Sequence, residues 1–133
     1  MSTFDFLQRF EEFLGRNGWP TNQSPWSIVE EWEALVQEAE VGYNWDYSEY
    51  SNDLGVRDLL AKALEDNTLK QYQQVPAMAE RVARADARFK DLLLPNVELG
   101  SPERPWWHRG VLAHAGDEYV NDIRNLFGIE VRG

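Results

Sequence analysis

The chain has 133 residues, 43% of them hydrophobic, which suits a single domain with a core of its own. Its net charge of −10 and isoelectric point near 4.6 argue against a phosphate-binding surface, so we expect neither nucleic acid nor an anionic membrane as a partner. The absence of cysteine excludes disulfides, thiolate metal sites and cysteine nucleophiles.

The first predicted element is a helix near the N-terminus. Apolar residues recur there at steps of three and four: Phe6, Leu7, Phe10, Phe13 and Leu14. Ser2 or Thr3 can cap this helix, and Gly15 and Gly18 stop it. The first residues lack the basic region and apolar run of a secretory signal, so we expect a cytoplasmic protein.

A second helix is predicted over residues 25–42, with Ser24 as its cap and Pro25 at its first position. Its apolar stripe consists of Ile28, Val29, Trp32, Leu35, Val36 and Ala39. Outside the stripe lie five glutamates: Glu30, Glu31, Glu33, Glu38 and Glu40. The helix should therefore pack one face on a core and expose carboxylates on the other, while Trp26 lies off the stripe.

Residues 43–52 show no helical stripe and are rich in turn-forming residues, so we predict a loop there. Asn52 or Asp53 can cap a third helix, which residues 66–68 end. A short further turn is expected over residues 69–74.

Pro76 opens a long predicted helix that extends to about residue 93. Arg81, Arg84 and Arg88 form a narrow stripe along it. We expect this stripe to pair with the glutamates of the second helix, and a solvent-exposed stripe is the alternative.

The C-terminal third is predicted to contain a linker over residues 94–101 and helices over residues 105–116 and 117–128. Residues 129–131 could form a short extended tail. No segment shows the period-two alternation of strands. The sequence therefore predicts an all-α, single-domain bundle of five or six helices over residues 1–133.

Negative charge is concentrated in one part of the sequence. Residues 17–56 contain eight acids and neither lysine nor arginine, so this window carries −8 of the net −10. It also contains four tryptophans and three tyrosines. Because aromatic anchors and complementary charge dominate protein interfaces, this combination favours binding to a basic protein.

The sequence therefore suggests a non-enzymatic, acidic binding module that occludes a basic partner, as an inhibitor or immunity protein does. We expect the partner to contact residues of the predicted loop and the outlying Trp26. The candidate binding residues are Trp26, Trp45, Asp46, Tyr47, Glu49, Tyr50 and Asp53. Nucleotide-binding, hydrolase and zinc-protease motifs are absent, so no cofactor is expected.

Two alternatives stay open at this stage. A small metal-binding protein or enzyme could be centred on four residues near the last turn: His108, His114, Asp117 and Glu118. The two histidines are six residues apart, which is poor spacing for one ion on a straight helix. The second alternative is a homo-oligomeric helical subunit whose exposed tryptophans are buried between copies.

Overall fold

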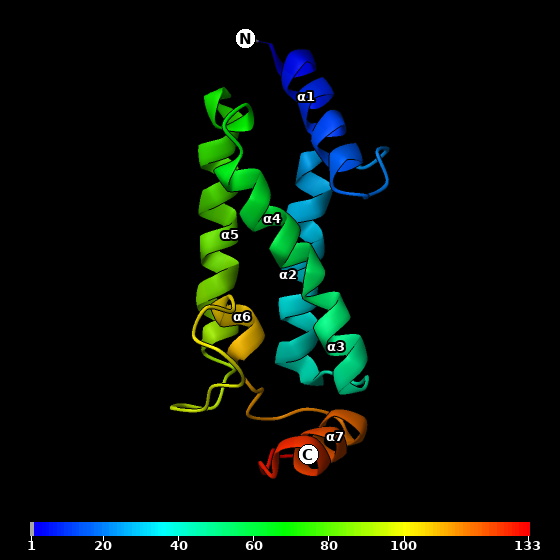
Figure 1. Ribbon diagram of the computed structural model, residues 1–133, viewed down its shortest axis with the longest axis vertical. Coiled ribbons are helices and arrows are strands. Elements are labelled where there is room, and N and C mark those ends of the chain that lie inside the picture. The colour runs from blue at the N-terminus through cyan, green and yellow to red at the C-terminus, as the bar shows by residue number, and fades with distance from the viewer. Residues whose placement is uncertain (1) are drawn as a thin grey trace.

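The computed structural model describes residues 2–133 as a bundle of helices (Figure 1). Within this range six helices have seven residues or more: α1 (Thr3–Arg16), α2 (Pro25–Gly42), α3 (Tyr47–Asp53), α4 (Gly55–Glu65), α5 (Gln74–Lys90) and α7 (Asp117–Phe127). A single α-helical turn, α6 (Trp106–Arg109), and a 3₁₀ turn, η1 (Leu69–Gln71), complete the helices. Residues 2–133 contain no strand and two isolated β-bridges. The all-α prediction is confirmed.

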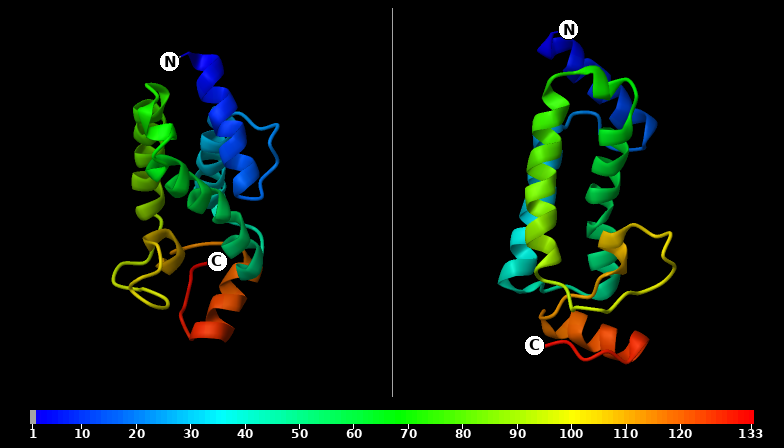
Figure 2. Two further views of the ribbon diagram at one scale, coloured as in Figure 1. Left: turned by 45° about the horizontal axis from the view of Figure 1, so that its top comes forward. Right: turned by 90° about the vertical axis from the view of Figure 1, so that its left-hand side faces the viewer.

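The chain runs the length of the bundle three times. It follows α2 toward the end where α7 lies, returns along α3 and α4, and runs back along α5 (Figures 1 and 2). As a result α2 and α5 are parallel neighbours, and α1 and α7 lie at opposite ends of the bundle.

Polar side chains cap the beginnings of α1 and α2. Ser2 Oγ accepts a hydrogen bond from the Asp5 amide at 3.1 Å, and Ser24 Oγ accepts one from the Ser27 amide at 3.1 Å. Each bond satisfies an amide that has no partner within the helix, so both predicted caps are confirmed. Gly128 ends α7 at φ +67°, a conformation that favours glycine.

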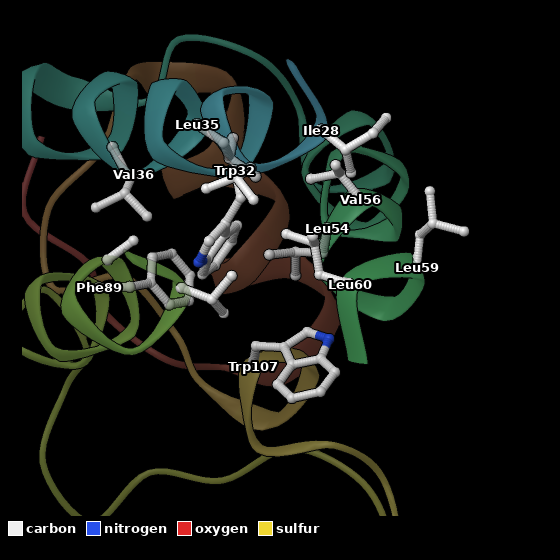
Figure 3. Close-up of a cluster of buried hydrophobic side chains, with 14 of the residues drawn as sticks. Ile28, Trp32, Leu35, Val36, Leu54, Val56, Leu59, Leu60, Phe89 and Trp107 are labelled. Carbon is white, nitrogen blue, oxygen red and sulfur yellow. The ribbon is translucent and has the colours of Figure 1, made fainter. Parts of the chain in front are cut away.

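The core lies between α2, α4 and α5 (Figure 3). Trp32 of α2 is fully buried, and its ring meets Phe89 of α5 edge-on at a centroid distance of 5.1 Å. Leu60 of α4 is also fully buried in this cluster. Trp32 belongs to the apolar stripe predicted for α2, whose members share one helix face because of their i, i+3 and i+4 spacing.

A largely buried ion pair crosses this core. Arg57 of α4 donates from Nε and Nη2 to the two carboxylate oxygens of Asp86 on α5, at 2.9 Å each. The Trp32 indole donates to the same carboxylate at 3.1 Å. Asp86 thus ties three helices together with charge-assisted hydrogen bonds, which are stronger than neutral ones.

The same arginine joins α6 to the bundle. Its guanidinium carbon lies 4.1 Å from the ring centroid of Trp107, close enough for a cation–π contact. The Trp107 indole donates to Asp58 at 2.8 Å, and His108 Nε2 lies 2.9 Å from both oxygens of that carboxylate. The single turn α6 is therefore held by side chains of α4 rather than by its own length.

Two predicted elements are wrong. Residues 43–52 are not a loop throughout, because α3 begins at Tyr47 after Asp46 accepts a hydrogen bond from the Glu49 amide at 2.8 Å. The predicted helix over residues 105–116 is only the turn α6, and residues 110–116 are extended. The chain there pairs with residues 92–94 instead, through bonds such as Leu94 N to Val111 O at 2.8 Å.

The C-terminal tail follows the prediction. After Gly128 the chain is extended and pairs with residues 113–115. The Arg132 amide donates to Ala113 O at 3.1 Å, and Ala115 donates to Arg132 O at 2.9 Å. Val131 is buried in the core, so the tail is held by packing as well as by hydrogen bonds.

Candidate functional site

Helix α2 carries two pairs of glutamates, each seven residues apart, and the two pairs have different neighbours. Glu33 pairs with Arg81 of α5 and Glu40 with Arg88, each through Nε at 3.1 Å and through Nη2. Arg84 bonds within its own helix. The expected pairing between the two helices is therefore confirmed for two of the three arginines.

The other pair, Glu31 and Glu38, faces away from α5. Both side chains line a groove of about 470 Å³ between α2 and the junction of α3 with α4. Asp53 adds a third carboxylate to this groove and accepts a hydrogen bond from the buried Tyr43 hydroxyl at 2.6 Å. Trp19, from the turn after α1, supplies an aromatic wall. We call this cavity the α2–α3 groove.

A second concavity of about 340 Å³ lies beside the first. Trp45, Asp46 and Glu49 line it together with Glu118 of α7. Trp45 is 55% exposed, and its indole donates to Glu38 of the α2–α3 groove at 3.1 Å. The two concavities therefore share a border. We call the second the Trp45 pocket.

Backbone contacts with α7 place Glu118 in the Trp45 pocket. The Gly116 amide, just before α7, donates to Tyr43 O at 2.7 Å, and Asp122 of α7 accepts from the Tyr47 amide at 2.9 Å. A Cβ at Gly116 would lie 3.0 Å from Tyr43 O, so the approach depends on glycine. These contacts bring the first turn of α7 against α3.

Six carboxylates surround the two concavities: Glu31, Glu38, Asp46, Glu49, Asp53 and Glu118. Together with Trp19 and Trp45 they form what we call the acidic face. Within residues 2–133 none of the six forms a salt bridge. This differs from the opposite side of α2, where two arginines of α5 neutralise the glutamates.

The unpaired charges of the acidic face act on one another. The pKa of Glu49 is raised above its usual value chiefly by the negative charge of Asp53, with a smaller contribution from Asp46. Partial burial raises the pKa of Glu31, and Asp53 adds to the effect. Like charges held this close destabilise the ionised carboxylates, so a cation placed among them would relieve repulsion.

The structure brings four of the predicted binding residues together and separates three. Trp45, Asp46, Glu49 and Asp53 lie on the acidic face. Tyr50 is only 2% exposed and contacts Tyr43 and Tyr119 in the core, so its assignment as a surface anchor is wrong. Its burial follows from α3, which turns this side chain inward.

The other two predicted residues lie outside the two concavities. Tyr47 is half-buried, with its ring 5.5 Å from that of Phe127 in α7. Trp26 is also half-buried, and the guanidinium carbon of Arg81, on α5, lies over its ring at 5.4 Å from the ring centroid. Neither has the exposed, acid-lined surroundings of Trp45.

Four members of the acidic face were not among the binding residues predicted from the sequence: Trp19, Glu31, Glu38 and Glu118. The seven-residue spacing of Glu31 and Glu38 was a usable signal, since it places both on one side of α2. Trp19 and Glu118 reach the site through contacts between distant segments, which no local pattern indicates.

The structure does not assemble the alternative metal or catalytic cluster. Residues 2–133 contain no group of three or more histidine or acidic side chains arranged to hold a metal ion. His108 pairs with Asp58, whereas His114 lies in the extended segment before α7. His108 lines none of the four cavities described for this part of the chain.

Comparison with protein-family models, curated proteins and solved structures finds no match to this chain. Among residues 2–133, no helix is both long enough and apolar enough to cross a bilayer.

Proposed function

We propose that the protein is a non-enzymatic binding module that holds a basic segment of another protein on its acidic face. The observation that carries this proposal is the contrast between the two sides of α2. One glutamate pair is neutralised by arginines of α5, and the other opens onto adjoining concavities whose six carboxylates have no basic partner within the described residues.

Arginine or lysine side chains of a partner fit this arrangement in two ways. Their charge would relieve the repulsion by Asp53, which is the chief cause of the raised pKa of Glu49 and adds to the effect of burial on the pKa of Glu31. Their stems and planar groups could pack on Trp45 and Trp19, since cations bind favourably over indole rings. Tryptophan and arginine are also the residues that most often dominate binding energy at interfaces.

A surface of this kind suits an inhibitor or immunity-like protein. A field of one sign steers an oppositely charged partner and speeds association, and aromatic contacts then slow dissociation. An enzyme or toxin that acts on nucleic acid needs a positive site, and the acidic face is complementary to such a site. Occluding that site would block the partner's activity.

Capture of native partners tests the proposal with a matched pair of variants. Wild-type protein, the face variant Trp45→Ala with Glu49→Lys, and the control variant Phe4→Ala with Glu65→Lys are each immobilised. The control removes another exposed aromatic ring and reverses another exposed charge, on α1 and α4.

We expect wild type and control to retain the same basic proteins at low salt and to release them at high salt, because salt screens exposed charges. The face variant should bind them at least about tenfold more weakly. Equal capture by all three proteins, or capture that salt does not affect, would contradict the proposal.

Self-association is a second candidate, favoured by exposed apolar side chains. Val41 is 84% exposed, and Leu126 and Phe127 at the end of α7 are also exposed. A second copy of the chain could cover them. Sedimentation velocity at two concentrations tests this, since a monomer at high concentration would argue strongly against it.

A further inference from the structure

A groove of about 770 Å³ opens near the C-terminal end of α5, away from the acidic face. It is bounded by the end of α5, the segment that follows it, and α6. In Figures 1 and 2 this segment projects beyond the bundle beside α6. Its lining includes Lys90, Leu93, Val97, Glu98, Trp106 and Arg109. We call it the α5–α6 groove.

The α5–α6 groove carries the opposite charge from most of the molecule. Two cations and one carboxylate line it, in a protein whose net charge is −10. Within residues 2–133 Lys90 forms no salt bridge, and its Nζ lies 4.6 Å from the ring centroid of Trp106. This places an uncompensated positive charge at an aromatic surface.

The guanidinium of Arg109 has only some of its hydrogen-bond donors paired. Its Nη1 donates to Glu98 at 3.2 Å, while its Nε is buried and has no hydrogen-bond partner among the described residues. The Arg109 side chain is 20% exposed, whereas Glu98 is 65% exposed. A single bond to an exposed carboxylate is weak, so an incoming anion can replace it. A guanidinium prefers two parallel bonds to one carboxylate.

Backbone hydrogen bonds hold the segment that lines the groove near both of its ends. Leu94 N donates to Val111 O at 2.8 Å, and Leu99 N donates to Arg109 O at 2.8 Å. Leu93 packs so closely on Gly110 that a Cβ there would lie 2.5 Å from Leu93 Cδ1. The backbone that carries Leu93 and Arg109 is therefore held in place before any ligand arrives, which reduces the cost of binding.

We propose that the α5–α6 groove binds a small carboxylate attached to a flat apolar body. Lys90 and Arg109 contact the carboxylate, and Leu93, Val97 and Trp106 contact the body. Glu98 accepts a hydrogen bond from the Arg109 guanidinium in the free protein and moves away from it when the ligand binds. Ligand sites of a few hundred Å³ with an apolar wall and few charged groups follow this pattern. The proposal does not depend on the function proposed for the acidic face.

Calorimetric titration with benzoate, 2-naphthoate and indole-3-acetate tests this assignment, and 2-naphthamide serves as the uncharged analogue. We expect saturable one-to-one binding of at least one carboxylate and much weaker binding of the amide. Arg109→Gln should weaken binding roughly 10-fold to 100-fold, as loss of a charge-assisted hydrogen bond does.

Glu98→Gln should have the opposite effect and tighten binding several-fold, because it removes the competing carboxylate. A merely structural role for Glu98 would not produce this gain. The matched controls Lys70→Gln and Glu65→Gln alter an exposed pair with a 3.6 Å separation on another part of the surface, and they should change affinity little. No saturable binding of any carboxylate, or no gain in Glu98→Gln, overturns the proposal.

Discussion

Replacing Arg57 with methionine should destabilise the protein strongly, because it leaves the carboxylate of Asp86, whose side chain is only 15% exposed, without its cation. In the folded protein Asp86 receives two guanidinium bonds at 2.9 Å and one indole bond at 3.1 Å. Only the indole bond survives in Arg57→Met. Breaking a buried pair from one side costs about 3–5 kcal/mol. At this chain length that corresponds to a fall in Tm of roughly 10–20 °C.

Urea unfolding followed by far-UV circular dichroism measures the deficit. Two variants calibrate it. Arg57→Met with Asp86→Asn removes both charges but keeps an oxygen for the Trp32 indole, so it should recover most of the lost stability. Arg88→Met breaks an exposed pair and should cost several times less. A deficit below about 1 kcal/mol for Arg57→Met would refute the reasoning, since it would mean that water solvates Asp86.

Three further outcomes follow from the positions of side chains in and beside the acidic face. Tyr50→Phe should change the free energy of unfolding by less than about 1 kcal/mol, because the buried Tyr50 hydroxyl forms no hydrogen bond of normal geometry within residues 2–133. Tyr50→Ala should cost about 3–5 kcal/mol, because it removes a buried ring. Equal losses of the two variants in thermal melts would contradict this. Glu49→Gln should raise Tm at pH 7, because the raised pKa of Glu49 means that its ionised carboxylate destabilises the fold. The gain should disappear well below pH 4.5, where Glu49 is protonated in both the folded and the unfolded protein. A gain that persists there would count against the charge argument. Trp45→Ala should leave Tm nearly unchanged, since the Trp45 ring is mostly exposed. A large fall in Tm would show that Trp45 stabilises the fold.

Local signals in the sequence were sufficient for the main helices. Ser24 and Pro25 fixed the start of α2, and the seven-residue spacing of Arg81 and Arg88 matched that of Glu33 and Glu40 in a parallel neighbour. Amphipathic period and capping are local properties, so they can be recognised without knowing the fold.

Helix α3 was missed because its apolar stripe is made mostly of tyrosines. The residues Tyr47, Tyr50 and Leu54 follow one another at steps of three and four, which is a helical pattern once tyrosine is counted as apolar. Tyr50 and Leu54 are buried and Tyr47 is half-buried. Counting them as polar surface residues also produced the wrong role for Tyr50.

Other features depend on contacts between distant segments. Residues 110–116 are extended because they pair with the chain after α5, and Gly110 fits against Leu93. The acidic face likewise needs α7 to bring Glu118 beside Trp45. Such pairings are decided by tertiary packing, which overrides local preference.

The most direct test of the acidic face is to map the binding of a basic peptide by the indole N–H signals of the six tryptophans in a ¹H–¹⁵N spectrum. Titration with an arginine-rich peptide at low salt should shift the signals of Trp45 and Trp19, which line the two concavities. The buried Trp32 and Trp107 should stay in place. A glutamine-substituted peptide should shift none of them. Saturable shifts centred on Trp106 or Trp26, with Trp45 unaffected, would contradict the account.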